Sequence, residues 1–124
     1  MGDEDEMIEQ QIQEKGLTAP RVTRQQIEEC IVAEYSFTAS DAVNDDMPRD
    51  EAYAPLRRLT FVVLVLRNGF TVTGESACVS ADNFDAGIGV QIARKHAVDK
   101  IWLLEGYALA DRLYQQVQPM QAPE

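Results

Sequence analysis

The chain has 124 residues, 45% of them hydrophobic, which is enough apolar material for one modest core. Its 21 acidic and 11 basic residues give a formal net charge of −10, and a chain this acidic repels the phosphates of DNA and RNA. No apolar run approaches the roughly 20 residues that span a bilayer. We therefore expect neither a polymeric nucleic acid nor a membrane as partner, and a cytoplasmic location.

The acidic residues are concentrated in the front half of the chain. Residues 1–56 contain 14 Asp and Glu against 4 Lys and Arg, whereas residues 57–124 contain 7 of each kind. Residues 1–18 carry only a thin apolar stripe, so we expect an acidic segment that is flexible or weakly helical. A single domain is predicted over residues 19–117, followed by a flexible tail at residues 118–124.

The first helix of the predicted domain has a clear start. Thr23 and Gln26 have the spacing of a capping box, in which each side chain accepts a hydrogen bond from the other residue's backbone amide. We expect the helix to run from about Arg24 to Glu34 and to bury Ile27 and Ile31 on one face.

The following segment, residues 36–55, is rich in Asp, Asn, Ala and Pro, which is typical of a loop or lid. Three aromatic residues, Tyr35, Phe37 and Tyr53, lie at its edges. They are either anchors that hold the loop in place or rings that stack on a ligand, and the sequence leaves both interpretations open.

A β-hairpin is predicted next, because two β-rich runs, residues 61–67 and 70–78, flank an Asn-Gly pair. Asn and Gly tolerate the positive φ angles of a two-residue type I′ turn. With such a turn Val63 would face Gly74 and Val65 would face Val72. The first strand is apolar on both faces, so we expect a cover on each side.

A long helix of about 33 residues is predicted after Ser80, which would cap its start. One stripe of this helix carries small residues such as Ala93 and Ala97, and a second carries larger ones. We expect the large face to pack on the sheet and the small face to admit another helix in a homo-oligomer; the alternative is a single core around the helix. A helix this long favours a kink near Val98-Asp99 or Gly106.

Together these elements predict an α+β fold, with an antiparallel hairpin or small sheet packed against a long C-terminal helix and a short N-terminal helix. No catalytic motif is present: the sequence lacks a phosphate-binding glycine loop, a metalloprotease helix and a nucleophile elbow. Cys30, Cys78 and His96 are too few and too scattered for a metal site or a disulfide framework. We therefore predict no enzyme activity, no catalytic residue, no cofactor and no metal.

A binding site for a nucleotide-like ligand is easier to assemble from this sequence. Such a ligand needs a ring for its base, amide or carboxylate groups for its ribose, and cations for its phosphates. Residues of all three kinds occur in the second half of the chain. The candidates are Arg67, Phe70, Asn83, Arg94, Asp99 and Lys100.

These candidates cannot all meet within one straight-helix subunit. At 1.5 Å per helical residue, Asp99 lies about 24 Å from Asn83. A site that uses both residues would therefore have to lie between two subunits. The residue-by-residue alternatives are structural: Asn83 as a helix-start residue, Phe70 as a cross-strand packing residue, and Asp99 and Lys100 as solvated helix positions.

Short motifs from roughly Pro20 to Leu113 resemble, in one order and spacing, a family of small phage proteins. Several members of that family look like Thoeris anti-defence sponges of the first type. The motifs are Val22-Thr-Arg-Gln-Gln-Ile27, Arg67-Asn-Gly-Phe70, Gly74-Glu-Ser-Ala-Cys78, Asn83-Phe-Asp85, Ile92-Ala-Arg94, Lys100-Ile-Trp102 and Leu104-Glu-Gly-Tyr107.

The resemblance implies a sponge that binds glycocyclic ADP-ribose, a signal made by bacterial TIR-domain defence enzymes, and holds it without cleaving it. It also implies binding of cyclic oligonucleotides by some members, dimers that build hexamers, and a ligand site at the dimer interface in the host cytoplasm. Phe70, Asn83, Asp99 and Lys100 are the residues to which the resemblance assigns ligand contacts. The rival hypothesis is an acidic inhibitor whose residues 3–6 and acidic loop engage a basic host protein.

Overall fold

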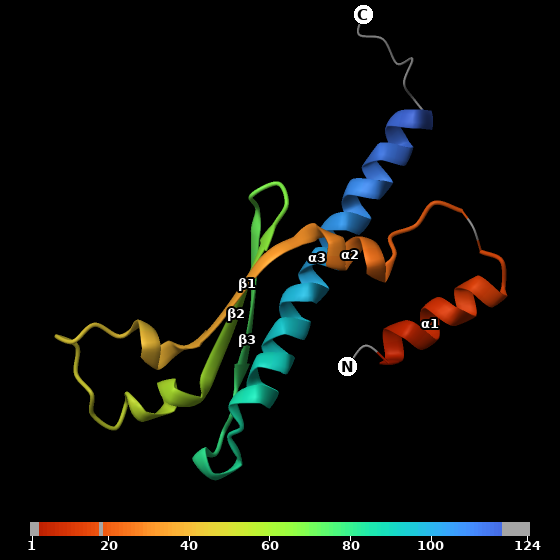
Figure 1. Cartoon of the computed structure of the whole chain (residues 1–124). Helices are drawn as coiled ribbons and strands as arrows, with labels where there is room; N and C mark the ends of the chain where they lie inside the picture. The colour runs from red at the N-terminus through yellow and green to blue at the C-terminus, as the bar shows by residue number, and fades with distance from the viewer. Residues whose placement is uncertain (1–2, 18, 118–124) are drawn as a thin grey trace, which may run out of the picture. The chain divides into compact units, whose positions relative to one another are not determined.

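The structure is a computed structural model that describes residues 3–17 and 19–117. It confirms the predicted α+β fold, with a short N-terminal helix, an antiparallel sheet and a long C-terminal helix packed on that sheet (Figure 1). The predicted tail at 118–124 lies outside the described residues. The elements are α1 (Asp3–Glu14), α2 (Arg24–Cys30), β1 (Ile31–Thr38), η1 (Ala39–Ala42), η2 (Ala54–Arg58), β2 (Leu59–Leu66), β3 (Thr71–Ala77), η3 (Ala81–Asn83) and α3 (Ala86–Val117).

The chain divides into two compact units. One unit comprises residues 30–100 and holds the whole sheet together with the first half of α3. The other comprises the described residues up to Glu29, with α1 and α2, and those from Ile101 onward, with the second half of α3.

Helix α2 begins where the sequence predicts and ends earlier. The Thr23 hydroxyl accepts a hydrogen bond from the Gln26 amide at 3.2 Å, and the Gln26 side-chain oxygen accepts one from the Thr23 amide at 3.0 Å. This reciprocal pair confirms the capping box. The predicted helix to Glu34 is wrong, because α2 ends at Cys30 and the chain continues as a strand.

Strand β1 is therefore the element that the sequence analysis missed. It carries the β-branched and aromatic residues that favour strands, and Ala33, Tyr35 and Phe37 alternate on one face. It pairs antiparallel with β2, placing Tyr35 opposite Val63. The sheet order is β1-β2-β3, so β2 is the central strand and the predicted two-stranded hairpin gains a third strand.

The hairpin between β2 and β3 has a wider loop than expected, and the predicted type I′ turn is wrong. Its register is shifted by one residue, so Val62 faces Gly74 and Leu64 faces Val72. Only Gly69 in this loop has a positive φ, of 89°, whereas a type I′ turn needs two such residues. The Asn68 side chain instead accepts a hydrogen bond from the Phe70 amide at 3.0 Å, which holds the wider loop.

Helix α3 packs on the sheet through its small-residue face, the reverse of the predicted orientation. A Cβ atom added to Gly74 would lie 2.0 Å from the Ala93 carbonyl oxygen and 2.6 Å from the Ala97 nitrogen. The helix backbone can approach the sheet this closely only because these three residues are small. The core of this unit includes Val62, Leu64, Leu66, Val72, Ala93 and Ala97, with Thr60 as the one buried polar residue among those that the structure describes.

The opposite face of the sheet is apolar but half-open. Tyr35 is 61% exposed, and Phe37 stacks on Phe61 with 5.7 Å between the ring centroids. The expected cover on both faces of β2 is therefore found on one face only, within the part of the chain that the structure describes. The long helix is confirmed, and it runs from Ala86 to Val117 as one continuous element.

Candidate ligand-binding site

The hairpin loop and the middle of α3 bring four of the predicted site residues toward one end of the sheet. Gly74 lies against Ala93 and Ala97, which fixes the register between β3 and α3. From that contact, β3 leads back to the hairpin loop with Arg67 and Phe70, and α3 leads forward, in the same direction, to Asp99 and Lys100. Figure 1 shows the hairpin loop at the end of the sheet opposite to η3.

Arg67 and Lys100 are the free cations of this group. Both side chains are exposed, and neither has an ion pair or a side-chain hydrogen bond within the described residues. Phe70, three residues after Arg67 in the hairpin loop, exposes 56% of its surface. In a chain with a formal charge of −10, two cations without a carboxylate partner are available for an external anion.

Arg94 and Asp99 are already engaged by partners in the same unit. The Arg94 Nε donates to both carboxylate oxygens of Glu34, at 3.1 and 3.3 Å, and thereby ties α3 to β1. The Asp99 carboxylate lies 3.6 Å from the Lys95 ammonium, one helical turn away. A ligand that used either residue would have to compete with these contacts.

Asn83 lies at the other end of the unit. It is the last residue of η3 and is exposed, so the prediction that it stands at the start of the long helix is wrong. The Ser80 hydroxyl does cap, but it accepts from the Asp82 amide in η3. Asp85 caps α3, since its carboxylate accepts from the Ile88 amide at 2.9 Å.

One subunit therefore does not bring Asn83 to Lys100. From Ala86 to Asp99 the continuous helix rises about 20 Å at 1.5 Å per residue. The helix is unbroken between these residues, and the predicted kink near Asp99 stays a prediction. A site that contains both Asn83 and Lys100 requires a second copy of the chain.

The aromatic residues at the edges of the predicted loop have two different roles. Tyr53 is buried, its hydroxyl accepts a hydrogen bond from Arg49 at 3.0 Å, and the guanidinium carbons of Arg49 and Arg57 lie 5.0 and 5.2 Å from its ring centroid. Tyr53 is thus an anchor for the segment before β2. Tyr35 and Phe37 are strand residues of the half-open sheet face.

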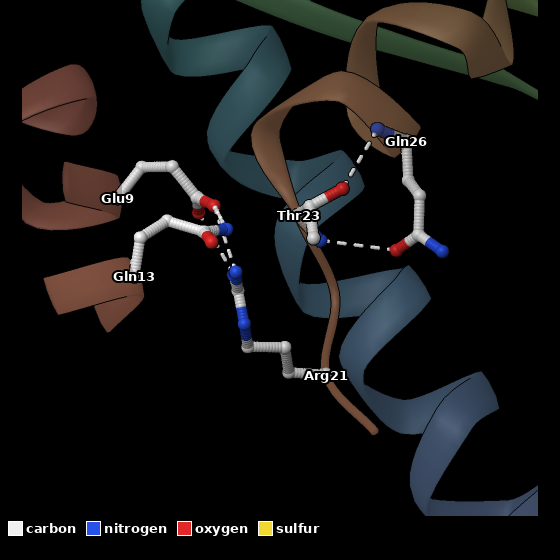
Figure 2. A network of polar contacts seen from close by, with 5 residues as sticks. All are labelled: Glu9, Gln13, Arg21, Thr23 and Gln26. Carbon is white, nitrogen blue, oxygen red and sulfur yellow. Dashed lines mark hydrogen bonds and ion pairs between the residues drawn. The ribbon is translucent and has the colours of Figure 1, made fainter. Parts of the chain in front are cut away.

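A polar cluster that the sequence analysis did not single out lies between α1 and the segment before α2. Arg21 forms two hydrogen bonds with the Glu9 carboxylate, at 2.8 and 2.7 Å, and Gln13 donates a third at 2.8 Å (Figure 2). Hydrogen bonding by Arg21, and then by Gln13, lowers the pKa of Glu9 to about 2. The spacing of charges along α1 alone does not reveal this pairing, because the partners are 12 residues apart.

The groove beside this cluster is lined by polar and charged residues and has a volume of about 580 Å³. Three glutamates and two arginines line it, and both arginines are paired with glutamates of α1: Arg21 with Glu9, and Arg24 with Glu6 at 2.8 Å. The cluster therefore fastens α1 to the following segment and leaves no unpaired cation for an anionic ligand among the described residues of the groove.

The reactive side chains of the chain are dispersed. The His96 Nδ1 lies 2.9 Å from the Glu75 carbonyl oxygen, which can only accept, so this nitrogen carries the proton. Cys30 is buried, and the Cys78 thiol donates to the Ser80 carbonyl oxygen at 3.1 Å. Within the described residues no three metal-ligating side chains come together, and no helix there is long and apolar enough to cross a membrane.

The comparisons with known proteins identify one relationship. Residues 22–113 match the Phage protein (N4 Gp49/phage Sf6 gene 66) family, and this match covers most of the chain. Neither the comparison with curated proteins nor the comparison with solved structures finds a match. The matched range contains the sheet and nearly all of α3, the elements that hold the candidate site. The chain therefore belongs to the Phage protein (N4 Gp49/phage Sf6 gene 66) family.

Proposed function

We propose that this phage protein binds a small anionic nucleotide signal and sequesters it intact, as a sponge against bacterial Thoeris-type immunity. Glycocyclic ADP-ribose is the leading ligand, and cyclic oligonucleotides are the second class. The observation that carries the proposal is an unpaired Arg67 and an exposed Phe70 in the hairpin loop, and an unpaired Lys100 on the part of α3 that runs toward the same end of the sheet. Membership of a phage protein family and the resemblance to anti-defence sponges support it further.

The proposed contacts follow from the chemistry of each side chain. The Arg67 guanidinium offers a planar pair of donors to a phosphate, and the Lys100 ammonium offers a compact positive charge. The Phe70 ring is exposed enough to stack on a base, an interaction that every nucleobase accepts. No step of bond cleavage is assigned to the protein, because binding alone removes the signal from its effector.

The complete site is proposed to lie between subunits. Asn83 and Asp99 would read the ribose or base edge, and Asn83 reaches Lys100 only from another copy. We propose a homodimer as the binding unit, with hexamers as the assembly that the family resemblance implies, working in the host cytoplasm.

A second candidate function rests on the charge of the front half. Residues 1–56 hold 14 acidic and 4 basic residues, and Glu4 and Asp5 of α1 are exposed. An acidic surface of this kind fits direct inhibition of a basic host protein. Removal of residues 1–18 separates the two proposals: a sponge keeps its ligand binding, whereas an inhibitor that uses this surface loses its activity.

Calorimetric titration with glycocyclic ADP-ribose tests the site. Arg67→Ala and Lys100→Ala should each weaken binding by about 1 to 3 kcal/mol, the usual loss when a charged hydrogen-bond partner is removed. Lys15→Ala is the matched control, because Lys15 is an exposed cation outside the site and its loss should leave the affinity unchanged. Equal affinity in all four proteins would remove both cations from the site, and no binding by the unmodified protein would end the proposal for this ligand.

A further inference from the structure

The second half of α3 is apolar around most of its circumference yet largely uncovered. Between Ile101 and Val117 the chain has two acidic residues, Glu105 and Asp111, and one basic residue, Arg112. Only Ile101 in this stretch is fully buried. A helix that is hydrophobic on nearly all sides is normally buried, so we expect another protein surface to cover this segment.

The exposed residues of this segment fall on one seam. Leu103, Tyr107, Ala110, Tyr114 and Val117 follow one another at alternating spacings of four and three residues, the pattern of a coiled-coil contact line. Their exposure is high: Leu103 77%, Tyr107 76%, Tyr114 56% and Val117 78%. Neither α1 nor α2, which belong to the same compact unit, covers them.

We infer that this seam docks on the same seam of a second copy of the chain, as an antiparallel helix pair centred on Ala110. The order of side chains on the seam is nearly palindromic: a large aliphatic residue, a tyrosine, a small residue, a tyrosine and a large aliphatic residue. A two-fold axis through Ala110 places Tyr107 beside Tyr114 of the partner subunit and Leu103 beside Val117 of the partner subunit. Self-complementarity of this kind is the requirement for a two-fold symmetric interface.

The area of the seam agrees with a pair of this kind. A buried tyrosine removes about 150 Å² or more from water, so two tyrosines with two aliphatic residues bury on the order of 500 Å² per helix. The pair then buries on the order of 1,000 Å², which is the lower bound of a specific protein interface. The small Ala110 at the centre lets the two backbones approach, so that the flanking tyrosines can interdigitate.

This interface is distinct from the one expected from the sequence. The alanine face at Ala93 and Ala97, which was expected to receive another helix, is occupied by the sheet. The seam lies on the second half of the helix, and the inference depends on its exposure and spacing alone. It stands whether or not the protein binds a nucleotide.

Light scattering on the full-length chain at micromolar concentration tests the inference. The unmodified protein should have at least twice the 13.9 kDa mass of one chain. The double substitution Leu103→Lys with Tyr107→Lys should give an assembly of at most half the mass of the unmodified protein, with an unchanged circular dichroism spectrum, because both side chains are exposed in one copy and any contact through other surfaces is untouched. Gln115→Lys with Gln116→Lys adds the same two charges off the seam and should leave the mass unchanged.

An Ala110→Cys variant gives a second readout that does not depend on disrupting the fold. Under mild oxidation it should form a covalent dimer through a disulfide across the axis, whereas Gln116→Cys at the same concentration should remain a single chain. A monomeric unmodified protein would overturn the inference. So would an unchanged oligomer in the folded Lys double variant, or no excess of the covalent dimer in Ala110→Cys over Gln116→Cys.

Discussion

Gly74→Ala is the sharpest test of how the long helix meets the sheet. The added Cβ would lie 2.0 Å from the Ala93 carbonyl oxygen, where ordinary contact needs about 3.4 Å. The difference, 3.4 − 2.0, means that helix and strand must separate by about 1.4 Å. Both neighbours are backbone atoms, so no side-chain rotation can relieve the contact.

That separation lowers the free energy of unfolding by an amount that can be estimated. Overpacking a well-packed core typically costs about 1 to 3 kcal/mol, and the separation here also loosens Val62, Leu64 and Ala97, none of which is exposed. We therefore expect Gly74→Ala to lower the free energy of unfolding by about 3 kcal/mol or more, which corresponds to a fall in Tm of roughly 10 °C.

Thermal and urea unfolding followed by circular dichroism measure this effect. Gly106→Ala is the matched control, because its added Cβ meets nothing within 4 Å and it removes a glycine from a helix interior. It should stabilise the protein by about 0.5 to 1 kcal/mol. A change in the unfolding free energy of less than about 0.5 kcal/mol in Gly74→Ala would contradict the close backbone contact between β3 and α3.

Three further predictions concern the described contacts. An NMR titration should find the Glu9 carboxyl with a pKa of about 2, and Arg21→Ala should return it toward 4.5; because the folded pKa is lowered, the stabilisation is present above pH 4.5 and is lost as the pH falls toward 2. Thr60→Val should be neutral or stabilise the fold by up to about 1 kcal/mol in urea unfolding, since the buried Thr60 hydroxyl has no hydrogen-bond partner among the described residues. Deletion of residues 1–18 should leave nucleotide affinity unchanged in calorimetry, and a loss of affinity would place α1 in the site.

Local capping chemistry made the start of α2 predictable, whereas α3 begins at Ala86 after Asp85 and not directly after Ser80. Thr23 with Gln26, and Ser80 with the Asp82 amide, form the hydrogen bonds that their spacing indicates. The length of the long helix was predictable for a different reason, because its apolar periodicity continues without a proline from Ala86 to Val117.

Features decided by tertiary contacts were not predictable in the same way. The residues after Cys30 extend the apolar spacing of α2, yet pairing with β2 gives them strand structure. The Asn-Gly pair suggested a two-residue turn, and the Asn68 side-chain bond to the Phe70 amide accompanies a wider loop. The face of α3 that meets the sheet depends on Gly74, a residue of another element.

For the candidate site, too, the kinds of residue were predictable from the sequence, whereas their contacts were not. The kinds of residue needed for an anionic ligand can be read from the sequence, and so can the need for a second subunit, from the helical rise between Asn83 and Asp99. The pairing of Arg94 with Glu34 could not be foreseen, because those residues are 60 positions apart. Among the three cations predicted for the site, Arg67 and Lys100 can be recognised as unpaired within the described residues only once the contact of Arg94 with Glu34 is known.

Recovery of an intact ligand tests the central claim most directly. Purified protein is incubated with glycocyclic ADP-ribose at a stoichiometric ratio, freed of unbound ligand, and then denatured by heat, and the released small molecule is analysed by mass spectrometry. A sponge should release unmodified glycocyclic ADP-ribose in an amount proportional to the protein, and the Lys100→Ala variant should release much less. Absence of ligand from the unmodified protein, or release of cleavage products, would contradict the proposed function.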